Sequence, residues 1–195
     1  MERIIRLIKI GEVDESTLKD LAKSLELKFK EHNITVDPSL NIMPLNKSWY
    51  NKQRGQYNAS KILNKITSIV KSEHIFRVLG IIDQDIYTES LYFVFGLAKT
   101  PRRNFQLHTV EGLISIKRLR ESFYRRTQNK KLFEERILKE AIHELGHTFG
   151  LLHCNKFCIM RFSNSLADTD NKPPEFCNTC LDDLKKFFEK LDNSF

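Results

Sequence analysis

The sequence predicts an α/β fold with a mixed β-sheet, and three observations lead to this prediction. Short runs rich in Ile, Val and Leu alternate with longer segments whose apolar residues recur every three or four positions. Such alternation is typical of strands and helices that pack in layers around one core. The chain has 195 residues, enough for a sizeable core, without an internal repeat or a low-complexity linker. We therefore expect a single domain over residues 1–195.

The N-terminal half is predicted to alternate between strands and helices. The run over residues 3–10 is rich in β-branched residues and ends at a glycine, as expected for a buried strand. The segment over residues 14–32 has the apolar spacing of an amphipathic helix. The further elements expected before residue 120 are a strand at 34–36 that ends before Asp37-Pro38, a loop at 46–58, a helix at 62–70, a strand at 76–82, an acidic turn at 83–85, and strands at 91–98 and 112–116.

The C-terminal part is predicted to be helical around one central motif. Residues 121–131 are highly charged and are expected to be exposed. A helix is expected from about residue 131, a polar surface loop at 164–174, and a short amphipathic helix over residues 181–191 that closes the domain. We divide the expected domain into an N-terminal part (1–130), an active-site helix with its following turn (131–153) and a cysteine-containing segment (154–195).

The strongest functional signal is the string His143-Glu144-Leu-Gly-His147-Thr-Phe-Gly150-Leu-Leu-His153. Histidines four residues apart lie on one face of a helix and can bind the same metal ion. Gly150 allows the chain to leave the helix through a left-handed turn, which would return His153 as a third nitrogen ligand. Three imidazoles with one open position are typical of catalytic zinc, and Glu144 lies where it can take a proton from water. Two histidines at this spacing also occur by chance, but the string fixes five positions over eleven residues.

Four cysteines lie within the last 42 residues, namely Cys154, Cys158, Cys177 and Cys180. The two-residue gap of the second pair is common in zinc knuckles. The N-terminal residues are too charged for a signal peptide, and no apolar run is long enough to span a membrane, so we expect a cytoplasmic protein. A reducing cytosol favours metal binding by clustered cysteines, with a disulfide or free structural thiols as the alternatives.

The formal net charge of +7 and the pI near 9.2 allow two interpretations. The densest basic stretch runs from Lys99 to Lys131 and includes Arg102, Arg103, Lys117, Arg118, Arg120, Arg125, Arg126 and Lys130. A solvated basic surface is the simpler interpretation. The alternative is a preference for acidic substrates or partners, including nucleic acid.

The histidine string followed by Cys154, Cys158, Met160, Cys177 and Cys180 resembles the archaemetzincins, a branch of the metzincin metallopeptidases. The resemblance implies a catalytic zinc on the three histidines, a structural zinc on the four cysteines, and a methionine turn beneath the metal. It also implies a metzincin-like domain with an antiparallel edge strand, near residues 91–98, that binds extended substrate. The gap between the first two cysteines is three residues here, one fewer than the family pattern.

Two functions are therefore considered. The first is a zinc peptidase that acts on peptides or proteins, with Glu144 as the general base. An aminopeptidase is one form that such an enzyme can take. The second is a non-catalytic module, stabilised by zinc, whose basic surface meets nucleic acid or acidic partners. Glu144 favours the first, because a purely structural site needs no carboxylate beside its ligands. We expect two zinc ions per chain and no membrane or nucleic-acid partner, whereas the oligomeric state has no signature in the sequence.

Overall fold

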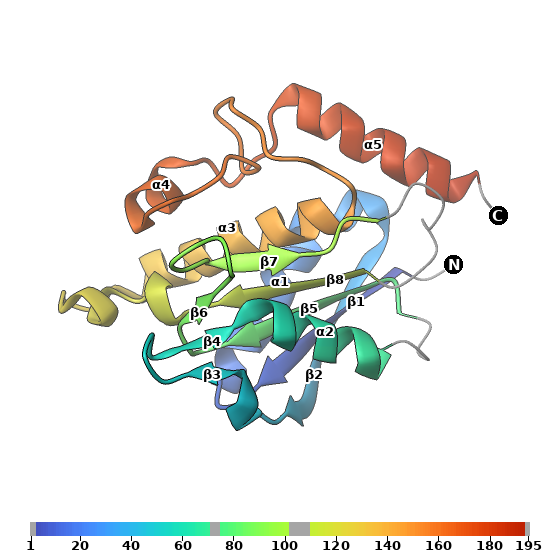
Figure 1. Cartoon of the computed structure of the whole chain (residues 1–195). Helices are drawn as coiled ribbons and strands as arrows, with labels where there is room; N and C mark the ends of the chain where they lie inside the picture. Colours follow the sequence, from blue (N-terminus) through green and yellow to red (C-terminus); the bar gives the residue numbers. More distant parts are fainter. Residues whose placement is uncertain (1–2, 71–74, 102–109, 194–195) are drawn as a thin grey trace.

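A five-stranded mixed sheet lies at the centre of the protein (Figure 1). The computed structural model describes residues 3–70, 75–101 and 110–193. Four strands are parallel, and the last pairs antiparallel with its neighbour at one edge, as the sequence predicts. In spatial order the strands are β2 (Ile34–Met43), β1 (Arg3–Ile10), β5 (Arg77–Ile82), β8 (Val110–Ser115) and β7 (Gly96–Ala98).

Helices cover both faces of this sheet, as a parallel sheet requires. The helices α1 (Glu15–Lys28) and α3 (Lys130–Thr148) pack on one face, and α2 (Ala59–Val70) packs on the other. Alternation along β1 builds both cores. Ile5 and Leu7 join the core beneath α1 and α3, whereas Ile8 and Ile10 join the core beneath α2. The predicted α/β architecture is therefore confirmed.

The C-terminal end of α3 is fixed between the sheet and the last helix, α5 (Asn178–Asp192) (Figure 1). Arg77 of β5 is fully buried, and its Nε donates a hydrogen bond to the carbonyl of Thr148 at 3.0 Å. Its guanidinium lies 5.5 Å from the ring centre of Phe149 and 5.3 Å from that of Phe187 on α5. A cation at a helix C-terminus interacts favourably with the helix dipole, so Arg77 stabilises the end of α3.

A second, small sheet supports the segment that leads into β7. It contains β3 (Tyr50–Asn51), β4 (Gln56–Asn58) and β6 (Ile86–Tyr87) in that order. The Gln56 side chain donates hydrogen bonds to the Tyr92 carbonyl at 3.0 Å and to Asp85 at 3.1 Å. The prediction of a plain loop at 46–58 is therefore wrong, because strands of two or three residues are too short to leave a periodic pattern.

Two predicted strands have different lengths in the structure. The strand expected at 34–36 continues through Pro38 to Met43. Proline is tolerated there because β2 is an edge strand, where one side of the backbone needs no ladder partner. The strand expected at 91–98 is confined to Gly96–Ala98. Before it, the backbone N–H of Val94 bonds to the carbonyl of Ile86, so this part of the chain follows the small sheet instead.

The predicted polar loop at 164–174 contains a short helix, α4 (Leu166–Asn171), capped by the Ser165 side chain. Four 3₁₀ turns complete the described secondary structure: η1 (Lys30–His32), η2 (Lys47–Trp49), η3 (Lys117–Leu119) and η4 (Glu121–Tyr124). Every helix in the described ranges is too short or too polar to span a lipid bilayer.

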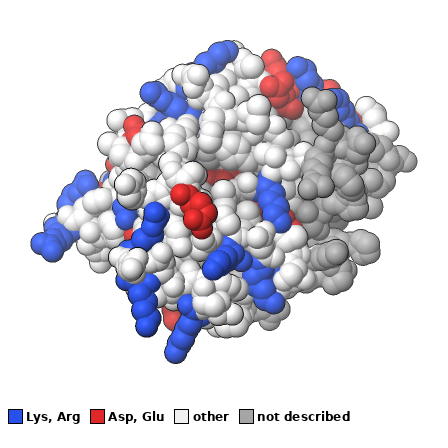
Figure 2. Space-filling model, viewed as in Figure 1, with Lys and Arg blue, Asp and Glu red and all other residues white. Residues whose placement is uncertain are grey.

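The basic stretch from Lys99 to Lys131 is partly neutralised within the fold. Arg118 pairs with Asp85 at 2.6 Å, and Arg120 pairs with Asp83 at 2.8 Å. The acidic turn at 83–85 therefore has the structural role that the sequence favours. Figure 2 shows Lys and Arg side chains spread over the visible face rather than gathered in one patch. Arg102, Arg103 and His108, a possible stray ligand in the sequence, lie outside the described residues.

The charged segment at 121–131 is not entirely exposed, contrary to prediction. Glu121 is buried because Arg136 of α3 pairs with it at 2.7 Å. Arg136 also binds Asp170 of α4 through two hydrogen bonds, of 2.6 and 2.7 Å. These contacts, with Asp170 as the larger cause, raise the pKa of Arg136. The buried guanidinium thus connects α3, η4 and α4.

Two arginines that pair with the same glutamate allow this connection to be tested. Arg136→Ala should lower the free energy of unfolding by about 3–5 kcal/mol, because it leaves Glu121 buried without its main partner. Arg126→Ala removes a partner whose side chain is 56% exposed, so it should cost less than about 1 kcal/mol. Urea unfolding measures both, and equal losses would contradict the role given to Arg136.

Candidate active site and metal centres

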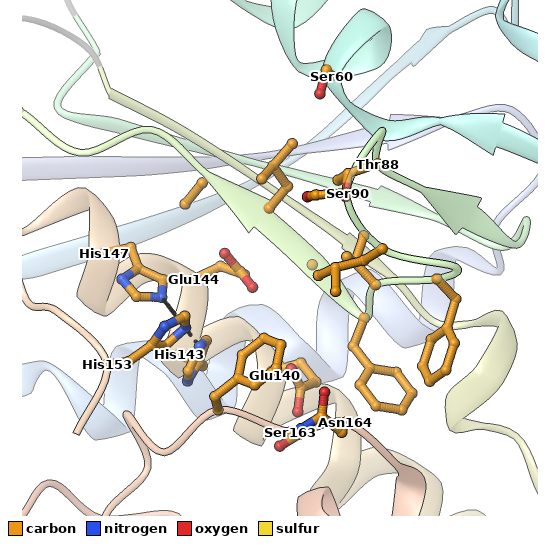
Figure 3. A pocket seen from close by; sticks show the side chains of 18 of the residues that line it. Ser60, Thr88, Ser90, Glu140, His143, Glu144, His147, His153, Ser163 and Asn164 are labelled. Atoms are coloured by element: carbon orange, nitrogen blue, oxygen red, sulfur yellow. Dashed lines mark hydrogen bonds between the residues drawn. The ribbon is translucent and has the colours of Figure 1, made fainter. Parts of the chain in front are cut away.

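Three histidines converge at the end of α3 (Figure 3). His143 and His147 lie one turn apart on the helix. The chain then leaves the helix through Gly150, whose φ of +91° lies in the left-handed region, and returns His153. The Nε2 atom of His147 lies 3.2 Å from the Nε2 atoms of both His143 and His153. The predicted turn therefore brings all three imidazoles together.

Backbone carbonyls orient the two helical imidazoles. His143 Nδ1 lies 2.9 Å from the carbonyl oxygen of Ile159, and His147 Nδ1 lies 2.8 Å from that of Leu151. A carbonyl only accepts, so each Nδ1 carries the proton and each Nε2 presents a lone pair. Burial, the largest cause in each case, lowers the pKa of all three imidazoles, that of His143 the most. The lowered pKa values favour neutral imidazoles, the form that can bind a metal ion.

This donor set fits a zinc ion. The Nε2 lone pairs of His143 and His147 face each other at 3.2 Å, and they repel unless a proton or a metal cation lies between them. Neutral imidazoles whose second nitrogen bonds to a backbone carbonyl are typical of metal-ligating histidines. Three nitrogen ligands with a further open position match the coordination of catalytic zinc rather than a closed structural site.

Glu144 follows His143 and faces the same cleft. Its side chain is 4% exposed, and within the described residues its Oε2 atom is buried without a hydrogen-bond partner. The backbone of β7 passes directly over it, because any side chain at Gly96 would collide with the Glu144 carboxylate. Burial, followed by the nearby carboxylate of Glu140, raises the pKa of Glu144 well above its usual value.

The histidines and Glu144 lie in a cleft of about 810 Å³ between β7 and α3. Figure 2 shows this hollow across the middle of the molecule, and Figure 3 shows its interior. The segment from Thr88 to Ala98 forms one wall, and Phe162, Ser163 and Asn164 contribute to the opposite wall. Most of the first wall is apolar, whereas the imidazoles and carboxylates of α3 give the cleft its polar groups.

The four cysteines form a second cluster. Their sulfur atoms lie within 4.8 Å of one another and form no disulfide. Cys154 Sγ lies 3.8 Å from Cys177 Sγ, close to the edge of a tetrahedron with zinc–sulfur bonds of about 2.3 Å. The backbone N–H of Cys177 donates to Cys158 Sγ at 3.3 Å. The backbone N–H of Cys180 is the largest cause that lowers the pKa of the Cys177 thiol to about 7, whereas burial raises the pKa of the Cys158 and Cys180 thiols. The shortened gap after Cys154 is therefore accommodated.

The two clusters share one loop. Ile159, whose carbonyl orients His143, lies between Cys158 and Met160. The backbone N–H of Cys154 donates to the Met160 carbonyl at 3.0 Å, which closes the loop. Met160 is fully buried against Gly146, between the turns of α3 that carry His143 and His147. This position supports the methionine turn implied by the sequence resemblance.

Sequence reasoning missed one charged pair beside the site. Lys172 Nζ lies 2.9 Å from Glu140 Oε1, and both side chains are almost fully buried. Glu140 also lines the cleft, together with Ser163 and Asn164. The only sequence signal is that Glu140 precedes Glu144 by one helical turn, which places both carboxylates on one face of α3. Lys172 lies in a segment predicted to be a surface loop, so its burial had no signal.

Gly150 and Gly55 provide a test of the turn that positions His153. Both have positive φ, of +91° and +68°, and an added Cβ at either position would meet only ordinary van der Waals contacts. Alanine at either should therefore lower stability by about 1–2 kcal/mol. Only Gly150→Ala should also weaken zinc binding at the histidines, by about tenfold or more, in a chelator competition. Equal zinc affinities for the two variants would contradict the role of the turn.

The model of peptidase family M54 matches residues 8–186 of this chain. A curated relative from Methanocaldococcus jannaschii, described as archaemetzincin, is 41% identical over 177 residues, which are 90% of this chain and 89% of the relative. The relative from Pyrococcus furiosus with the same description is 38% identical and is covered over 97% of its length.

Solved structures agree with the sequence comparison. The crystal structure of archaemetzincin from Methanopyrus kandleri has a TM-score of 0.81 and 32% identity, with 96% of each chain covered. A zinc-dependent peptidase from Methanocorpusculum labreanum has a TM-score of 0.77 and 27% identity, covering 92% of this chain and 99% of its own. A match over nearly the whole chain, with the histidine and cysteine clusters in place, shows that this protein belongs to peptidase family M54, the archaemetzincins, a family of zinc metallopeptidases.

Proposed function

We propose that His143, His147 and His153 bind the catalytic zinc and that Glu144 is the general base for peptide-bond hydrolysis. The observation that carries this proposal is the buried Oε2 atom of Glu144, which has no partner in the described structure and faces the cleft beside the three convergent imidazoles. Zinc bound at the histidines supplies a Lewis acid, which acidifies water and polarises the substrate carbonyl.

The chain's own residues perform the proton transfers. Glu144 Oε takes a proton from the attacking water and later donates it to the leaving amine. Its burial against β7 keeps the carboxylate in one position, which aligns it without reorganisation during the reaction. The backbone carbonyls of Ile159 and Leu151 keep His143 and His147 in the tautomer that directs Nε2 into the site.

The edge strand β7 provides a way to hold the substrate. It pairs with β8 on one side, and no other described strand pairs with it. An extended peptide can therefore add to the open side of β7, above Glu144, through main-chain hydrogen bonds. Peptides or unfolded protein segments are the substrates that suit this geometry. The aminopeptidase type and the cytoplasmic location stay predictions.

We further propose that Cys154, Cys158, Cys177 and Cys180 bind a second, structural zinc. The support is the tetrahedral spacing of their sulfurs and the loop that they share with Ile159 and Met160. A metal there would stabilise the fold and also hold the carbonyl that orients His143. The family relationship favours this enzyme over the non-catalytic binding module.

Glu144→Gln tests the proposed general base. It should reduce kcat for peptide hydrolysis by about 10²–10⁴-fold, because glutamine cannot accept the proton, while zinc content and melting temperature stay unchanged. The matched control is Glu134→Gln, on the same helix with a side chain that is 43% exposed, which should retain full activity. Hydrolysis that survives in Glu144→Gln would exclude this role.

Cys177→Ser tests the second metal site. Elemental analysis should show zinc falling from two ions to one per chain, and the melting temperature should fall with it, because a structural zinc contributes folding free energy. Thr179→Ser, between Cys177 and Cys180, is the control and should change neither quantity. Two zinc ions with an unchanged melting temperature in Cys177→Ser would disprove the four-cysteine site.

A further inference from the structure

The charged side chains that line the cleft differ in sign from the excess charge of the whole chain. The chain carries a formal net charge of +7. Among the described residues that line the cleft, however, there are three carboxylates, Glu89, Glu140 and Glu144, and no lysine or arginine. Figure 2 shows acidic side chains in and beside the central hollow, with the basic side chains spread around it. Among charged side chains, the described lining therefore offers hydrogen-bond acceptors for a cationic group and no basic partner for an anionic one.

Glu140 is the carboxylate best placed to contact a substrate side chain. It is 3% exposed and precedes Glu144 by one turn of α3. Its Oε1 atom accepts a hydrogen bond from Thr169 at 3.0 Å and lies 2.9 Å from Lys172 Nζ. Both contacts are made to Oε1, and no described residue hydrogen-bonds to Oε2. One oxygen is therefore anchored to the protein interior, and the other is available to the cleft.

Lys172 does not cancel this preference for a cation. It does not line the cleft, and it is 3% exposed, so it does not itself contact a group bound in the cleft. Its ammonium group offsets the cost of burying the Glu140 carboxylate and fixes its orientation, as a paired buried charge requires. A cation in the cleft would contact Glu140 Oε2, because Thr169 and Lys172 both occupy Oε1.

Polar groups from the opposite wall complete a subsite. Figure 3 shows Glu140, Ser163 and Asn164 together at one end of the cleft, beyond His143. The Ser163 hydroxyl oxygen is buried and has no hydrogen-bond partner in the described structure. A carboxylate, a hydroxyl and an amide can together accept the several N–H donors of an ammonium or guanidinium group.

The direction of the strands determines which substrate residue reaches this subsite. In Figure 1, β7 and α3 run in the same direction. A peptide that pairs antiparallel with β7 would therefore run from the C-terminal end of α3 towards its N-terminal end. Its chain would pass His147 before reaching Glu140. The side chain that follows the bond cleaved at the histidines then lies beside Glu140.

We propose that Glu140, held by Lys172 and Thr169, is a specificity-determining residue that selects Lys or Arg immediately after the scissile bond. This inference rests on the proposed function for the cleavage position. It names the substrate class as peptides with a basic residue on the C-terminal side of the cleaved bond. Inside the cleft, a basic substrate side chain would meet carboxylates and no lysine or arginine of the described lining.

The test uses fluorogenic peptides that are identical except for Lys, Arg, Leu or Glu after the scissile bond. The zinc-bound protein should cleave the Lys and Arg peptides with kcat/KM at least about tenfold above the Glu peptide, as expected for a charge-assisted hydrogen bond. Glu140→Gln should remove this preference. Glu134→Gln, at a 43% exposed carboxylate of α3 that does not line the cleft, is the matched control and should retain it.

A second variant controls for misfolding of Glu140→Gln, which leaves Lys172 buried without its counter-charge. The double variant with Glu140→Gln and Lys172→Met removes both charges, and it should also lose the preference. Equal kcat/KM values for all four peptides with the unaltered protein would overturn the proposal. A preference that persists in both variants would overturn it as well.

Peptide binding separates failure of this inference from failure of the proposed function. If no peptide is cleaved, the proposed function fails, and the affinity of the zinc-bound Glu144→Gln variant for the same peptides still tests the subsite. Fluorescence anisotropy should give a Kd about tenfold lower for the Lys and Arg peptides than for the Glu peptide. Equal Kd values would overturn the assignment of Glu140.

Discussion

The convergence of three imidazole nitrogens at the end of α3 is the constraint on which the rest of the structure depends. Helical spacing alone brings two of them together. The third requires a left-handed turn at Gly150, and that turn requires the end of α3 to be held in place. Arg77 of the sheet and Phe187 of α5 hold it through contacts with Thr148 and Phe149. The geometry of the site is thus set by residues far from it in sequence.

Buried charge is the second recurring feature, and two buried ion-pair groups connect α3 to other segments. Arg136 meets Glu121 and Asp170, and Lys172 meets Glu140. Both α4 and the residue that follows it supply partners to α3. Breaking such a pair would leave an uncompensated charge in the interior. These pairs therefore hold the segment between Met160 and Cys177 against the active-site helix. This segment also completes one wall of the cleft.

The parts of the protein that the sequence predicts correctly are those governed by local patterns. The strand over residues 3–10, the helix that carries His143 and His147, and the final helix each have a clear apolar period. The histidine string also encodes its own turn through Gly150. Its resemblance to a known family also implied the antiparallel edge strand, which the structure contains, and the two metal sites, which stay predictions.

The parts that sequence reasoning missed depend on contacts between distant residues. The small sheet at β3, β4 and β6 has strands too short for any period, and it forms because β6 arrives from a later segment. The burial of Glu121 and Lys172 has the same cause, since charged residues in polar segments give no sign of a distant partner. Glu140 was overlooked because its role in the cleft depends on where β7 and residues 163–164 lie.

X-ray absorption at the zinc edge tests the central claim most directly, because it identifies the ligand atoms without reference to activity. For the protein with two zinc ions bound, we expect sulfur to make up half of the first coordination shell, at about 2.3 Å. Nitrogen and oxygen should make up the other half, at about 2.0–2.1 Å. A shell that contains only sulfur, or only nitrogen and oxygen, would contradict the pairing of a histidine site with a separate cysteine site.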